Sequence, residues 1–187
     1  MTHKGTQELR TKRLVLRRFR EEDAQAMFDT WANDARVTKF LTWRPHGAVE
    51  VTKALLADWC AQYGREDYYH WVITLEGRAI GAINVVRWDT KNEQADLGYC
   101  MGFDFWGQGI MSEAAGAVID FLFAEVGVHR IVISHAVKNP ASGGVARKCG
   151  LQKEGVRREA YRTPEGDWLD LCDHAILDWE WAERNAR

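Results

Sequence analysis

The chain has 187 residues, of which 46% are hydrophobic and 28% charged, and this composition is typical of a folded domain in water. Its formal net charge of -2 excludes a strong overall positive field of the kind that attracts nucleic acid. No stretch approaches the roughly 20 apolar residues of a membrane-spanning helix, so no membrane partner is expected. We expect one domain over residues 1–187, with a core from about 10 to 182.

The first half of the chain mixes strand and helix patterns. A first strand is predicted at residues 14–19, and the acidic turn at 21–23 begins a helix that continues to about Trp31. Apolar residues then recur at helical spacing over residues 49–63. Three further strands are predicted, the first two joined by a hairpin turn: 69–75, 79–88 and 94–101.

From Ser112 onward, apolar residues recur at the spacing of a helix rather than of a strand. Residues 115–126 form an apolar helical face, and Gly127 ends it. The remaining predicted elements are a strand at 130–137, a short helix at 141–149, and two strands at 151–161 and 168–179. An antiparallel run followed by an α-crossover predicts an α/β (α+β) domain with a mixed sheet between helices.

The four cysteines lie far apart in the sequence: Cys60, Cys100, Cys149 and Cys172. No two of them form a CxxC pair, which argues against a cysteine metal centre and against a disulfide framework. Residues 1–6 contain no apolar run, so no signal peptide is predicted. We therefore expect free thiols, no bound metal and a cytoplasmic protein.

The segment Trp106-Gly107-Gln108-Gly109-Ile110-Met111-Ser112 is the most informative motif of the chain. Two glycines around one residue, directly before a helix, predict a tight loop whose backbone N–H groups favour an anion together with the helix dipole. The motif lacks the Lys and Ser/Thr of a P-loop and the third glycine of a dinucleotide fingerprint. We interpret this loop as a binding site for phosphate or diphosphate.

A second motif, Asn139-Pro140-Ala141-Ser142, opens the short helix, and alone it is more typical of a loop and a helix cap than of a functional site. The two motifs together make the chain resemble the acyl-CoA N-acyltransferase (GNAT) superfamily, and in particular its Rim-type ribosomal-protein N-terminal acetyltransferases. Ala95-Asp96-Leu97-Gly98-Tyr99 and Lys148-Cys149-Gly150-Leu151 extend that resemblance. It implies the acyl-CoA N-acyltransferase fold, with a mixed, mostly antiparallel sheet of about seven strands, splayed at its centre and flanked by about four helices.

The resemblance implies acetyl-CoA as cosubstrate. The glycine loop would bind the diphosphate through its N–H groups, and the pantetheine arm would lie between two strands that part. A backbone N–H near the end of the strand at 94–101 would polarise the thioester carbonyl. The cosubstrate-binding residues implied are Cys100, Met101, Trp106, Gly107, Gln108, Gly109, Ile110, Met111, Ser112, Asn139 and Ser142.

Transfer to an amine needs a base for the amine and a proton for the departing thiolate. The tyrosine acid of many family members is replaced by Ala146, so Ser142, which serves the sulfur in the Rim-type branch, is the expected acid. Asp96 is the first candidate base, although a carboxylate salt-bridged on a face of the sheet is an equal interpretation. Weaker candidates are Glu93, Glu159 and Tyr161. His135 shares strand parity with apolar neighbours and is expected to be packed or hydrogen-bonded.

The expected acceptor is a protein α-amino group, whose pKa of about 8 makes deprotonation easier than for lysine, near 10.4. Trp43 and His46 are expected to shape its pocket, although a loop anchored by one buried aromatic is an equal interpretation. Direct attack is favoured over a ping-pong route through Cys100 or Cys149. Two alternatives stay open: acetylation of a small-molecule amine, and an acyl-CoA-binding sensor without turnover. Monomer and homodimer are both compatible with the sequence.

Overall fold

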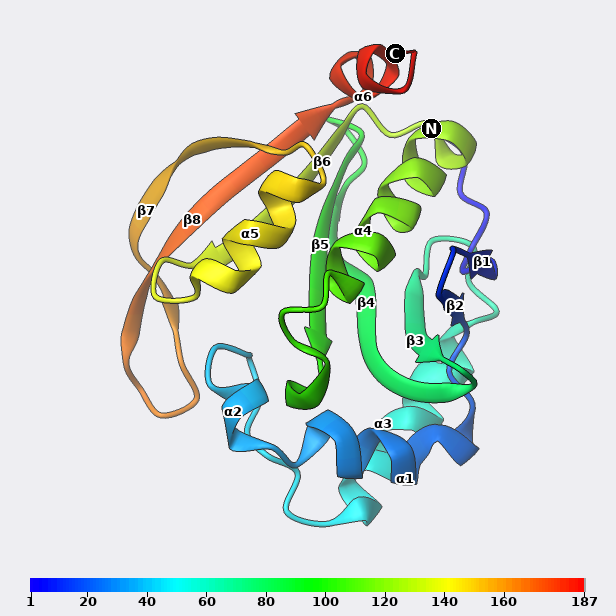
Figure 1. The fold of residues 1–187 in the computed structure, drawn as a ribbon, viewed down its shortest axis with the longest axis vertical. Helices are drawn as coiled ribbons and strands as arrows, with labels where there is room; N and C mark the ends of the chain where they lie inside the picture. Colours follow the sequence, from blue (N-terminus) through cyan, green and yellow to red (C-terminus); the bar gives the residue numbers. More distant parts are fainter. Residues whose placement is uncertain (187) are drawn as a thin grey trace.

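The computed structural model describes residues 1–186, and Figure 1 shows a single curved sheet with helices on both sides. Its eight strands lie in the order β1-β2-β3-β4-β5-β6-β8-β7. Every neighbouring pair is antiparallel except β5 and β6, which are parallel. The strands are β1 Leu9–Arg10, β2 Leu14–Arg17, β3 His70–Leu75, β4 Arg78–Asp89, β5 Gln94–Met101, β6 Arg130–Ala136, β7 Gln152–Arg162 and β8 Trp168–Leu177.

The described helices form two groups around this sheet. They are α1 Ala24–Met27, α2 Ala35–Thr38, α3 Val49–Gln62, α4 Ile110–Phe121, α5 Pro140–Lys148 and α6 Asp178–Asn185. In Figure 1, α4 and α5 lie in front of the sheet, whereas α1, α2 and α3 gather at its lower end. The sheet therefore has a hydrophobic core on each face.

Alternation along β3 shows how the sequence supplies both cores. Trp71 and Ile73 point into the core that α4 completes, and Val72, between them, points into the core formed with α1 and α3. All three side chains are fully buried. Because successive strand residues face opposite sides, a continuous apolar run is what a strand covered on both faces requires.

The parallel pair β5·β6 is short. It runs from Gln94 opposite Arg130 to Leu97 opposite Ile133 and then stops. Beyond this point β5 stays paired with β4 as far as Met101, and β6 stays paired with β8 as far as Ala136. The two strands therefore part from residues 98 and 134 onward and leave a wedge at the centre of the sheet. This is the splay that the family resemblance implied.

The structure corrects several predicted boundaries. The strand at 94–101 has the predicted bounds. The chain is helical from 21 to 32, as predicted, but the segment consists of a 3-10 turn, α1 and a π-helical turn at Phe28–Ala32 rather than one regular helix, and α2 follows it. The sheet has eight strands because the two-residue β1 pairs with β2. The last strand ends at Leu177, because Glu180 accepts a hydrogen bond from the Leu177 N–H at 2.9 Å and caps α6.

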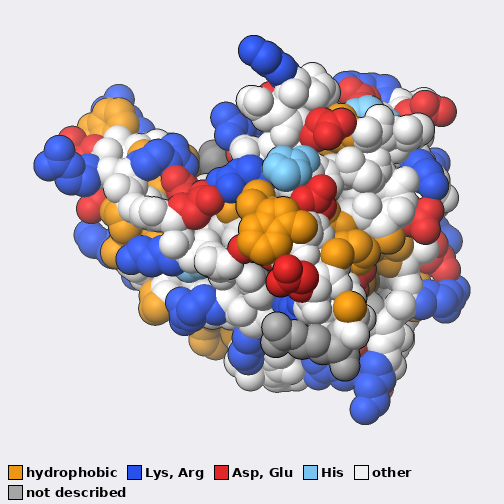
Figure 2. Space-filling model, turned by 90° about the horizontal axis from the view of Figure 1, so that it is seen from above, with side chains coloured by type: hydrophobic (Ala, Val, Ile, Leu, Met, Phe, Trp, Pro, Cys, Tyr) orange, Lys and Arg blue, Asp and Glu red, His pale blue; other side chains and the backbone are white. Residues whose placement is uncertain are grey.

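Basic and acidic side chains are intermixed over the face in Figure 2, unlike the continuous basic surface of a nucleic-acid-binding protein. Within residues 1–186, every helix is too short or too polar to span a lipid bilayer.

Candidate active site

A cavity of about 580 Å³ lies where β5 and β6 part. Its walls come from the end of β5, the glycine loop, the first turn of α4, the helix α5 and the segment at 36–41. Of the predicted cosubstrate residues, all line this cavity except Gln108, whose side-chain amide donates to the Asp104 carbonyl instead. The separation of β5 and β6 thus brings predicted residues from Cys100 to Ser142 around one cavity.

The glycine loop has the geometry of an anion seat. Gly107 and Gly109 both have φ of 74°, in the left-handed region where side chains with a Cβ are strained. Gly109 is the N-cap residue of α4, so no side chain caps the first-turn N–H groups of that helix. A Cβ added at Gly107 would meet no atom within 4 Å among the described residues, which leaves room for a ligand. These observations fit a diphosphate.

The loop is fixed to the start of the chain through Glu113. This carboxylate, in the first turn of α4, accepts from Arg13 Nε at 2.6 Å, from the Arg13 N–H at 2.9 Å and from Thr11 Oγ1 at 2.7 Å. Arg13 also donates to the Gln108 carbonyl at 3.2 Å. Burial alone would raise the pKa of Glu113, but these hydrogen bonds outweigh burial and leave the pKa below its usual value. Sequence reasoning did not assign this anchor.

Tyr99 and Ser142 form a hydroxyl pair in the cavity wall. The Tyr99 hydroxyl lies 2.8 Å from Ser142 Oγ and 3.1 Å from the Ser142 carbonyl oxygen. Burial raises the pKa of Tyr99, so the phenol stays protonated. The Asn139 side chain accepts from the Ser142 N–H at 3.4 Å and caps α5. Sequence reasoning selected Ser142 but missed Tyr99, although the strand parity that buries Leu97 also predicts that Tyr99 faces α5.

The geometry does not place the predicted bases in the cavity. Asp96 accepts from Arg87 Nε at 2.8 Å and from Gln94 Nε2 at 2.7 Å, and it lies on the opposite face of β5 from Tyr99. We therefore correct the assignment of Asp96 to an ion-paired surface carboxylate. Glu93 pairs with the N-terminal amine at 3.1 Å, and the Tyr161 hydroxyl donates to the Leu41 carbonyl at 2.8 Å.

The two residues expected to shape the acceptor pocket lie together beside the cavity. The ring centroids of Trp43 and His46 are 5.1 Å apart, and His46 Nδ1 lies 2.7 Å from Thr52 Oγ1. Burial lowers the pKa of His46, so the imidazole is neutral. Neither residue lines the cavity; Phe40 and Leu41, earlier in the same loop, do. The loop that contains Trp43 and His46 therefore reaches the cavity through Phe40 and Leu41, which the sequence analysis did not select.

Two cysteines near the cavity have the properties of packed thiols. Burial raises the pKa of Cys100 to about 12 and that of Cys149 to about 11. At neutral pH both are thiols rather than thiolates, and the thiolate is the nucleophilic form. The structure therefore gives no support to a cysteine-linked acetyl intermediate.

A direct test follows from these two thiols. When the protein is incubated with acetyl-CoA and no amine, we expect its intact mass to stay unchanged, because neither cysteine is ionised enough to attack the thioester. Mass spectrometry after rapid acid quenching measures this. An acetyl group located by peptide mapping on Cys100 or Cys149 would establish the ping-pong route instead.

The comparisons with known proteins now define the class of protein. Residues 13–152 match the family model described as the acetyltransferase (GNAT) domain. The chain therefore belongs to the GNAT acetyltransferases, and the prediction of an N-acetyltransferase with an acyl-CoA N-acyltransferase fold is confirmed.

Two relatives and one solved structure show how similar the chain is to individual acetyltransferases. The chain is 30% identical over 171 residues to the N-acetyltransferase YoaA of Bacillus subtilis, covering 90% of this chain and 96% of YoaA. It is 28% identical over 185 residues to the [ribosomal protein uS5]-alanine N-acetyltransferase of Escherichia coli, covering 92% of each. The structure of RimL, a ribosomal L7/L12 α-N-protein acetyltransferase in complex with coenzyme A, superimposes with a TM-score of 0.82 at 25% identity, covering 91% of this chain and 98% of RimL.

Proposed function

We propose that this protein transfers the acetyl group of acetyl-CoA to the α-amino group at the N-terminus of a protein. The observation that carries this proposal is the chemistry of the cavity wall: among the described lining residues there is a protonated hydroxyl pair but no carboxylate and no imidazole. Such a cavity can protonate a leaving group, but it offers no strong base to an incoming amine. The acceptor must therefore be an amine that loses its proton easily.

The pKa values of the possible acceptors decide between them. An α-amino group with a pKa of about 8 is about 10% neutral at pH 7, whereas a lysine with a pKa near 10.4 is only about 0.04% neutral. The roughly 250-fold difference in reactive amine favours a protein N-terminus when water is the only proton acceptor. The ribosomal-protein acetyltransferases among the relatives support the same acceptor class.

The residues present suggest how the donor would be held and activated. The N–H groups of the glycine loop would bind the diphosphate, and the edge of β5 that β6 leaves would hydrogen-bond the pantetheine arm. The neutral amine would attack the thioester carbon and pass its proton to water. As the C–S bond breaks, Ser142 Oγ would give its proton to the sulfur and take one from Tyr99. Tyr99 would then regain a proton from water, which balances the proton that the amine released.

Charge in the structure argues against a polyamine acceptor. A cationic small amine would require an acidic groove, but Asp96 and Glu93 are both engaged in ion pairs outside the cavity. The charged residues that line the cavity are cations: Arg36, Lys39 and Lys148. They would repel a polycation and attract the phosphates of the donor.

An acceptor panel tests the proposed function. We expect a peptide with a free N-terminal alanine and blocked lysines to be acetylated at least about 100-fold faster at pH 7, in kcat/KM, than an Nα-blocked peptide with a free lysine. The kcat/KM should rise with pH and level off above about pH 8, where the α-amine is neutral. Release of free coenzyme A thiol measures the rate.

The controls distinguish the remaining functions. Spermidine and a reaction without amine accompany the two peptides. Equal rates with the lysine peptide or with spermidine would contradict the N-terminal acceptor. Acetyl-CoA binding with no thiol release from any amine would identify a sensor.

A further inference from the structure

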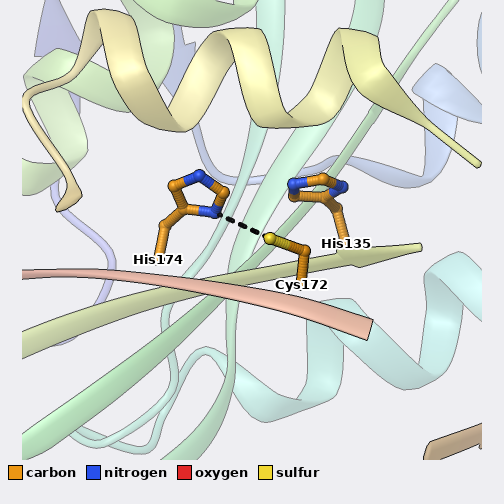
Figure 3. Close-up of side chains that lie close together, drawn as sticks. All are labelled: His135, Cys172 and His174. Carbon is orange, nitrogen blue, oxygen red and sulfur yellow. Dashed lines mark hydrogen bonds between the residues drawn. The ribbon is translucent and has the colours of Figure 1, made fainter. Parts of the chain in front are cut away.

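A cluster of metal-ligating side chains lies on the sheet face beneath α5. The antiparallel register of β6 and β8 places His135 opposite Cys172 and Ile133 opposite His174. Because strand residues two positions apart share a face, all three polar side chains point to the same side. One ligand atom of each lies within 4.8 Å of the others. Figure 3 shows the three side chains side by side between the strands and the helix.

One ring nitrogen of His135, Nε2, is free to bind a ligand. Its Nδ1 lies 2.8 Å from the Ala136 carbonyl oxygen, which places the proton on Nδ1 and the lone pair on Nε2. Nε2 is buried and has no hydrogen-bond partner among the described residues. A buried acceptor without a partner is costly, and a cation would satisfy it. Gly143 of α5 leaves room here, since a Cβ at that position would lie 2.7 Å from Nε2.

The other two side chains of the cluster already contact each other. His174 Nδ1 lies 3.9 Å from Cys172 Sγ, a weak contact that a metal bond would replace. Bonds of about 2.0–2.3 Å to one ion separate the ligand atoms by about 3.4–3.8 Å, so the cluster must contract by about 1 Å.

We propose that His135, Cys172 and His174 bind one thiophilic cation, with Cu⁺ preferred over Zn²⁺. Two imidazoles and a thiolate form a soft ligand set that suits both ions. The charged side chains around the cluster favour Cu⁺ over Zn²⁺. Arg147 of α5 lies beside Gly143 and His135, and Lys153 of β7 lies opposite His174 in the β7·β8 register. Asp173 is instead engaged with Ser134 and Arg157. A thiolate with Cu⁺ is neutral, but with Zn²⁺ it leaves a net positive charge beside two cations.

Metal titration of the full chain tests this site. The reduced, metal-free protein is titrated with Cu⁺ against a chromophoric Cu⁺ chelator and, in parallel, with Zn²⁺. We expect one Cu⁺ per chain, with Cys172→Ser weakening its binding at least tenfold. Cys60→Ser is the matched control, because Cys60 lies on α3 and its thiol donates to the Phe19 carbonyl, away from the cluster. Thermal melts confirm that each variant is folded.

Some results would overturn the proposal. Unchanged Cu⁺ affinity in folded Cys172→Ser, or no Cu⁺ binding by the wild-type chain, would remove the site. Tighter binding of Zn²⁺ than of Cu⁺ would overturn the preference for a monovalent ion. If Cys172→Ser fails to fold, His174→Asn takes its place in the same titration.

X-ray absorption of the wild-type Cu⁺ complex needs no variant. We expect one sulfur and two nitrogen neighbours around the copper. Two or more sulfur neighbours, or none, would place the ion elsewhere and refute the assignment.

Discussion

Replacing Ser142 by alanine is expected to lower kcat about 100-fold and to leave the KM for acetyl-CoA within a few-fold of the wild type. In the proposed mechanism, the Ser142 hydroxyl, which lines the cavity beside Tyr99, would protonate the departing sulfur, and this need arises only as the C–S bond breaks. Loss of an interaction made only in the transition state lowers kcat and kcat/KM together. Steady-state kinetics with a saturating N-terminal alanine peptide measures both constants.

Tyr99→Phe sharpens this experiment. If Tyr99 acts through Ser142, the double variant should be little slower than Ser142→Ala alone, because the two hydroxyls form one relay. Ser134→Ala is the matched control, since Ser134 is an exposed serine of β6 that donates to Asp173. An unchanged kcat in Ser142→Ala, or losses that multiply in the double variant, would contradict the relay.

Gly107→Asp is expected to raise the KM for acetyl-CoA about 10- to 100-fold relative to Gly107→Asn. Asn and Asp are nearly the same size and both tolerate the left-handed conformation that Gly107 adopts, so backbone strain affects both variants alike. They differ in one negative charge, which would lie against the diphosphate. Kinetics and calorimetric titration with coenzyme A at low and high salt measure the effect, which salt should weaken.

A second aspartate variant separates this effect from folding. Gly77, in the β3–β4 turn, also has positive φ, and a Cβ there meets no atom within 4 Å among the described residues. Gly77→Asp should therefore bind coenzyme A like the wild type. Equal affinities of Gly107→Asp and Gly107→Asn would show that the diphosphate lies elsewhere.

The parts of the fold and site that could be predicted are those that local patterns encode. The strand at 94–101 and the glycine loop depend on alternation and on residues that tolerate positive φ, and both are visible within a few positions. The helical segment that ends near Trp31 was predicted as one regular helix, whereas its hydrogen bonds change from 3-10 through α to π along the chain, a change that the spacing of apolar residues does not encode.

The remaining features depend on contacts between residues distant in sequence. The Arg13–Glu113 anchor joins residues 100 positions apart, and no periodicity reveals it. Asp96 looked like a base because its strand leads to the site, but the neighbouring strand supplies Arg87 as its partner. The cluster beneath α5 was missed because spacing between cysteines was examined, whereas His135 reaches Cys172 only through strand register.

The wedge between β5 and β6 also limits how strongly the two halves of the sheet are joined. Only four residue pairs join the half of the sheet that contains β1–β5 to the half that contains β6, β7 and β8. The pantetheine arm of the proposed donor, which carries its own amide groups, would act as an added strand and bind both halves at once. Donor binding would then couple two regions that otherwise open separately, so that amide hydrogens on both sides of the gap exchange more slowly with solvent.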